Sequence, residues 1–90
     1  MAPLNISYEP AFDLLARLLF GDEDPDQVLM DYTIEIALNP MSFPEVPHSG
    51  ERWGQFSLPS GTALILTFRV DQNMGIVSLT AIAAAMAVAA

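Results

Sequence analysis

The chain has 90 residues, a length that suits one domain with one hydrophobic core. Eleven acidic residues stand against three basic ones, so the formal net charge is -8, and 52% of the residues are hydrophobic. Cysteine is absent, which excludes disulfides, thiolate nucleophiles and cysteine-ligated zinc. The negative charge argues against nucleic-acid binding, because attraction to phosphates supplies most of that affinity. The high apolar fraction argues against wholesale disorder.

The acidic residues are concentrated in the first half of the chain. Residues 1–50 hold nine acids and one base, Arg17, whereas residues 51–90 hold two acids and two arginines. The second half is therefore neutral, and the first half carries the whole net charge. This distribution indicates either a solvated acidic surface that keeps an apolar protein in solution or an acidic face for a basic partner.

No targeting or membrane segment is recognised in the sequence. Residues 1–7 lack the basic and apolar regions of a signal peptide. The most apolar stretch, Gly75–Ala90, is dominated by alanine and is shorter than the roughly 20 residues that cross a bilayer. We therefore expect a cytoplasmic, single-domain protein over residues 1–90, compact over about residues 4–82, with an alanine-rich tail at residues 83–90.

The chain is expected to begin with a short strand and a helix. Leu4, Ile6 and Tyr8 alternate with polar residues, which is the period of a strand with one buried face. Pro10 suits the first turn of a helix, and Gly21 suits its end. The helix is predicted from Pro10 to about Phe20, with apolar residues recurring at a spacing of three to four: Phe12, Leu15, Leu18 and Leu19.

The following segment can be interpreted in two ways. Asp24 before Pro25 is typical of an N-cap, Gln27 stands at the capping-box position, and the run continues to about Asn39. These signals favour a helix that Pro40 stops. The rival interpretation is a strand, because four apolar residues alternate with polar or small ones: Tyr32, Ile34, Ile36 and Leu38.

As a helix, this segment has apolar residues on two sides. One side carries Val28, Leu29, Tyr32 and Ile36, and the other carries Met30, Ile34 and Leu38. One small sheet cannot cover both sides, and an uncovered apolar patch usually marks an interface. We therefore expect self-association as a homodimer, or an external protein partner, at a candidate interface formed by the first side and the tail: Val28, Leu29, Tyr32, Ile36, Met86 and Val88. The alternative is that the first helix covers the second side.

The second half of the chain is predicted to be three strands. A proline-rich loop from Pro40 to Gly50 precedes strand candidates at Arg52–Leu58, Ala63–Val70 and Ile76–Ile82. The order β-α-α-β-β-β indicates an α+β fold, an antiparallel sheet with two helices packed on one face. Converging periodicities predict one core that includes Leu15, Trp53, Leu66 and Phe68.

No residue pattern of an active site, a metal site or a cofactor site is recognised. Asp22, Asp24 and Asp26 resemble the start of a calcium loop, but Gln27 and Thr33 stand where glycine and glutamate are needed, so capping explains them better. The remaining candidate is a site that would bind an anion or a partner protein. It consists of the single histidine and two of the three arginines: His48, Arg52 and Arg69. The alternatives are a solvated histidine and arginines paired with Glu51 or Asp71.

Several strings, in this order and spacing, resemble the RelE/ParE toxin superfamily of bacterial type II toxin–antitoxin systems. The strings lie at residues 6–11, 38–40, 50–54, 67–71 and 75–82, so that the resemblance spans about residues 4–82. They resemble the opening strand and helix, the end of the second helix, the entry to the second strand and the final hairpin. The resemblance implies the RelE/ParE-like fold and an antitoxin-like partner.

The same resemblance implies that the usual nuclease groups are missing. RelE-like members are basic, ribosome-dependent mRNA nucleases with arginine or lysine on the sheet and histidine or tyrosine near the C-terminus. Here Ile65 and Phe68 stand at the strand positions of the usual arginine and tyrosine, and residues 82–84 are apolar. No catalytic residue is therefore carried over to this chain. ParE-like members resemble gyrase inhibitors and need no nuclease groups.

Three classes of function follow from the sequence. The first is a non-nucleolytic, RelE/ParE-like protein that acts by protein–protein binding, including a degenerate toxin. The second is a structural or homo-oligomeric α+β module, and the third is an active mRNA-cleaving toxin. The acidic charge and the missing nuclease groups favour the first class, and no cofactor is expected.

Overall fold

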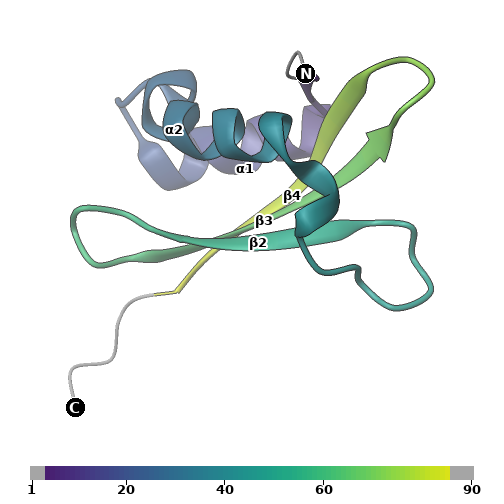
Figure 1. Cartoon of the computed structure of the whole chain (residues 1–90). Helices are drawn as coiled ribbons and strands as arrows, with labels where there is room; N and C mark the ends of the chain where they lie inside the picture. Colours follow the sequence, from purple (N-terminus) through teal and green to yellow (C-terminus); the bar gives the residue numbers. More distant parts are fainter. Residues whose placement is uncertain (1–3, 86–90) are drawn as a thin grey trace.

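A computed structural model describes residues 4–85, and its helices lie together on one side of a curved sheet (Figure 1). The predicted element order β-α-α-β-β-β and the α+β class are confirmed. The elements are β1 (Asn5–Tyr8), α1 (Pro10–Phe20), α2 (Pro25–Leu38), the short 3₁₀ helix η1 (Pro40–Ser42), β2 (Arg52–Ser57), β3 (Ala63–Asp71) and β4 (Ile76–Ala85).

The four strands form one mixed sheet in the order β1-β4-β3-β2. The neighbours β2 and β3, and β3 and β4, pair antiparallel through hairpins, as predicted. However, β1 pairs parallel with β4, in the register Ile6 to Val77, so the expectation of a wholly antiparallel sheet is wrong for this strand. The reason is the path of the chain, which passes through both helices to the far edge and returns by two hairpins beside β1.

The segment with two interpretations is a helix. The carboxylate of Asp24 accepts a hydrogen bond from the backbone N–H of Asp26 at 3.0 Å, and Pro25 occupies the first turn. Leu29, Thr33 and Ile36 recur at helical spacing, and all three are buried. In a strand, Ile34 and Ile36 would share a face, whereas here the side chain of Ile34 is half exposed.

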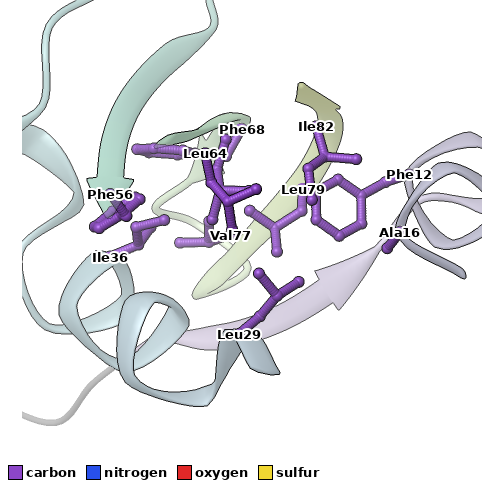
Figure 2. Packing of buried hydrophobic residues seen from close by; sticks show 11 residues of the cluster. Phe12, Ala16, Leu29, Ile36, Phe56, Leu64, Phe68, Val77, Leu79 and Ile82 are labelled. Atoms are coloured by element: carbon purple, nitrogen blue, oxygen red, sulfur yellow. The ribbon is translucent and has the colours of Figure 1, made fainter. Parts of the chain in front are cut away.

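The core lies between the two helices and one face of the sheet (Figure 2). In β3, Leu64, Leu66 and Phe68 alternate onto this face and are fully buried. The other elements meet them with residues that share low exposure: Phe12 and Ala16 of α1, Leu29 and Ile36 of α2, Phe56 of β2, and Val77, Leu79 and Ile82 of β4.

Two of the predicted core residues lie outside this cluster. Trp53 and Leu15 are 36% and 42% exposed, so their placement in the core is wrong, whereas Leu66 and Phe68 are placed correctly. Trp53 pairs with Thr67, and strand alternation turns both away from the helices. In α1, the position next to Leu15 is Ala16, whose small side chain lets the helix approach the sheet closely.

The last strand is longer than predicted. It continues to Ala85, because residues 83–85 pair with residues 63–65 of β3. Alanine has a high helix propensity, but pairing with the antiparallel neighbour β3 overrides that preference here. The remainder of the predicted tail, with Met86 and Val88, lies outside the described residues.

Replacing Leu66 with alanine should lower the free energy of unfolding by about 2–5 kcal/mol, since this fully buried side chain leaves a cavity. The matched control is Leu18→Ala, the same substitution at a side chain that is 72% exposed, which should change stability by less than about 0.5 kcal/mol. Urea unfolding of both variants measures the difference. Equal losses would contradict the placement of β3 in the core.

Gly54→Ala should be destabilising for a different reason. A Cβ on Gly54 would stand 2.7 Å from Cε1 of Phe43, whose ring is held by Phe56 and Phe68. We expect a loss of about 1–3 kcal/mol from overpacking. In a double-mutant cycle, the same change made beside Phe43→Leu should cost clearly less, and an equal cost in both backgrounds would refute the steric explanation.

Candidate functional site

No helix among residues 4–85 covers the second face of the sheet, here called the open face. Strand alternation places Trp53, Ile65, Thr67 and Arg69 on it, opposite the buried residues of β2 and β3. Trp53 and Ile65 are both over a third exposed. The open face therefore combines apolar side chains with one arginine.

That arginine is held by two carboxylates. Nη2 of Arg69 lies 3.2 Å from Oε1 of Glu51, and Nη1 lies 3.8 Å from Oε1 of Glu9. The hydroxyl of Thr80 donates to the other oxygen of Glu51 at 3.3 Å. The expected alternative, in which the arginines pair with Glu51 or Asp71, holds for Arg69 with Glu51, whereas the ion pairs of residues 4–85 include neither Arg52 nor Asp71. The two carboxylates together carry more negative charge than Arg69 carries positive charge.

Arg52 secures the loop that precedes β2. Its Nη1 donates to the backbone carbonyl of Phe43 at 2.7 Å from a half-buried position. Next to it, the N–H of Trp53 donates to the carbonyl of Pro44 at 3.0 Å. A guanidinium engaged in this way positions the loop, and one of its nitrogens is directed at a carbonyl oxygen.

The structure brings together two of the three residues predicted for anion binding. Arg52 and Arg69 both line an open groove of about 630 Å³ between the loop before β2 and the β3–β4 turn. Glu45 and Asp71 line the same groove, so the two arginines are balanced by two carboxylates. His48 is not among the lining residues; it is exposed, with a left-handed φ of 62°. The groove thus lacks the net positive charge that an anion site requires.

Metal chemistry finds no support in residues 4–85, where no group of three or more histidine, aspartate or glutamate side chains is arranged to hold a metal ion. Of the three aspartates that resemble a calcium loop, Asp24 caps α2, as the sequence indicates.

The most unusual surface is on α1. Its four leucines are Leu14, Leu15, Leu18 and Leu19, here called the leucine face, and all four are exposed, Leu14 at 61% and Leu18 at 72%. At about 100° per residue, Leu14 and Leu18 project roughly opposite to the buried Phe12 and Ala16. The sequence pattern places Leu15, Leu18 and Leu19 on one apolar stripe with Phe12 and predicts Leu15 in the core, whereas all three leucines are exposed here. Exposed leucines on this helix could have been predicted from the sequence, because four leucines among 11 residues cover more than one helical stripe.

The predicted interface on α2 needs correction. Leu29 and Ile36 are fully buried in the core, so they cannot form an interface in the folded chain. Val28 and Tyr32 are half-buried, and the hydroxyl of Tyr32 donates to the carbonyl of Ser57 at 2.9 Å. The sheet covers this side of α2, and the side left exposed carries Met30, Ile34 and Leu38.

Acidic residues surround these exposed apolar side chains. Residues 10–38 hold seven acids and one base, and that base, Arg17, is paired within α1 to Asp13 at 3.1 Å. No ion pair of residues 4–85 involves the other acids of the helical layer: Asp22, Glu23, Asp24, Asp26, Asp31 and Glu35. The helical layer is therefore apolar in patches and strongly negative around them.

Comparisons with known proteins identify the fold but no family. No protein-family model matches the chain, and no curated protein matches its sequence. Among solved structures, the chain is similar to the E. coli toxin RelE, in a mutant with two arginines replaced by alanine, solved in the free state. The TM-score is 0.64 at 13% sequence identity, over 90% of this chain and 82% of that one. The expected RelE-like fold is confirmed.

None of the helices among residues 4–85 is long and apolar enough to cross a membrane.

Tyr8 should report the acidic environment of the helical layer. Burial, followed by the negative charge of the nearby Asp26, raises the pKa of Tyr8 to about 12. The folded protein therefore keeps this proton above the ordinary pKa of 10.0, so the contribution of Tyr8 to stability is fully present below about pH 10 and is lost as the pH rises towards 12.

Ultraviolet titration of the two tyrosines and urea unfolding at alkaline pH test this expectation. Tyr8→Phe should remove the late-titrating phenol and flatten the alkaline loss of stability, and Asp26→Asn should lower the pKa of Tyr8. Tyr32→Phe is the control that leaves the late titration in place. A late titration that survives Tyr8→Phe would contradict the assignment.

Proposed function

We propose that this RelE-fold chain acts in the cytoplasm by binding another protein and does not cleave mRNA. The observation that carries the proposal is the leucine face of α1, an exposed apolar surface that the fold does not need for its own core. Exposed apolar patches on a folded protein usually mark sites of interaction. The structural similarity to a toxin supports a toxin-related origin.

The open face supports the absence of nuclease activity. A ribonuclease needs groups that move protons or stabilise charge at a phosphate. Here the basic residue on that face is Arg69, which two carboxylates hold, and its neighbours include Ile65 and Trp53. A net charge of -8 also opposes approach to RNA.

The partner class suggested by the fold is an antitoxin-like protein, encoded by a neighbouring gene. A homodimer is the alternative, and sedimentation equilibrium across micromolar concentrations separates the two. Under the proposal, the purified chain sediments as a monomer of 9.8 kDa and associates when the partner is added.

The nuclease part of the proposal is tested in a translating extract. Purified protein is added, and mRNA ends are mapped by primer extension. We expect no new ends with the wild-type chain, and the same result with Arg69→Ala. Specific cleavage by the wild-type chain that disappears with Arg52→Ala or Arg69→Ala would overturn the proposal.

The protein-binding part of the proposal is tested by capturing the partner protein on three forms of the chain: wild type, Leu14→Gln/Leu18→Gln, and Ile65→Gln. The last is a matched control, because it replaces an exposed apolar residue on the open face. A protein retained by the wild type and by Ile65→Gln, but lost with the double leucine variant, is the expected result. Retention that depends on Ile65 instead would contradict binding through α1.

A further inference from the structure

The leucine face has the dimensions and the spacing of a helix-docking surface. With 11 residues, α1 is about 16 Å long, and its exposed leucines follow the i, i+1, i+4, i+5 pattern of a helical ridge. A second amphipathic helix of about three turns could cover such a ridge with its own apolar stripe. No described element covers this ridge, since Leu14 and Leu18 are 61% and 72% exposed.

The charge around the leucine face selects the kind of partner. Asp22 and Glu23 lie just beyond the end of α1, separated from Leu19 by Phe20 and Gly21, and both acids are exposed. They also stand at the C-terminal end of α1, where the helix dipole is negative and cations are favoured. The basic residue in the last turn, Arg17, is already paired with Asp13. This end of α1 therefore has an unmet preference for positive charge.

The same charge disfavours a second copy of this chain as the occupant. Two copies that met through their helical layers would bring seven acids and one base against the same set. Like-charge contact across an interface is costly, particularly near apolar residues that exclude water. Nucleic acid and anionic lipid are disfavoured for the same reason.

From these observations we infer that the leucine face of α1 binds a basic amphipathic helix, whose leucine-like stripe packs on Leu14, Leu15, Leu18 and Leu19 and whose lysines or arginines face Asp22 and Glu23. This inference rests on the proposed protein-binding function and specifies its partner. The acids Asp31 and Glu35 of α2 are also exposed and add to the negative charge of the helical layer.

The probe is a set of three labelled synthetic peptides of about 18 residues, long enough for the three turns needed. The first has a leucine stripe and a lysine and arginine polar face, the second has the same stripe with glutamate, and the third is the first with its order scrambled. Fluorescence anisotropy with the full chain measures their affinities. We expect the first peptide to bind at least about tenfold more tightly than either control, and its affinity to fall as salt rises.

Variants of the chain locate the site. Leu14→Gln/Leu18→Gln should weaken the basic peptide at least about tenfold, and Asp22→Asn/Glu23→Gln should weaken it and reduce the salt dependence. Ile65→Gln on the open face should leave binding unchanged. Circular dichroism and urea midpoints confirm that each variant is folded. If the double leucine variant binds the basic peptide as tightly as the wild type, the binding is unspecific electrostatic attraction, and the inference is overturned.

The remaining outcomes separate this inference from the proposed function. Equal or tighter binding of the glutamate peptide, lost with Leu14→Gln/Leu18→Gln, would refute the basic partner and leave protein binding through α1 standing. Sedimentation that shows a dimer of the full chain, dissolved by the same double variant, would make a second copy the occupant and refute it as well. Binding of no peptide would also refute it, whereas mRNA cleavage would refute the proposed function alone.

Discussion

The structure depends on one constraint: a four-stranded sheet that buries only one of its faces. Leu64, Leu66 and Phe68 of β3 occupy the centre of that face, and the two helices cover them with Phe12 and Ile36. Each helix needs a single apolar stripe for this purpose. In a chain with 52% hydrophobic residues, apolar side chains therefore remain after the core is complete, and they lie on α1, on the outer side of α2 and on the open face.

The two surfaces left outside the core differ in their charge. On the open face, Arg69 is held between Glu9 and Glu51, so that polar groups largely satisfy each other there. On the helical layer, most acids have no basic counterpart among residues 4–85. The open face is thus self-contained, whereas the helical layer has both apolar area and negative charge that a partner could complement. This contrast is the reason why we propose an interaction surface on the helices rather than on the open face.

The parts of this fold that could be predicted from sequence are those set by local chemistry. Asp24 with Pro25 starts a helix because side-chain capping is a local effect, and the alternation of Leu64, Leu66 and Phe68 identifies the central strand. The parallel partner of β1 could not be predicted in this way, because periodicity does not state which strands pair. Trp53 and Leu15 were misplaced for a related reason: apolar character does not decide which face of a strand or helix meets the core. The two carboxylates around Arg69 come from distant segments, and only the fold brings them together.

The central claim is that the leucine face of α1 is open to solvent in the free protein. Because the chain has no cysteine, a single Leu18→Cys variant reports this directly through its rate of reaction with a thiol reagent. We expect a rate within about fivefold of that in urea, independent of protein concentration, with Leu66→Cys as the protected reference. Protection of Leu18→Cys by about a hundredfold or more, or protection that grows with protein concentration, would show that the fold or a second copy already covers this face and would contradict the account.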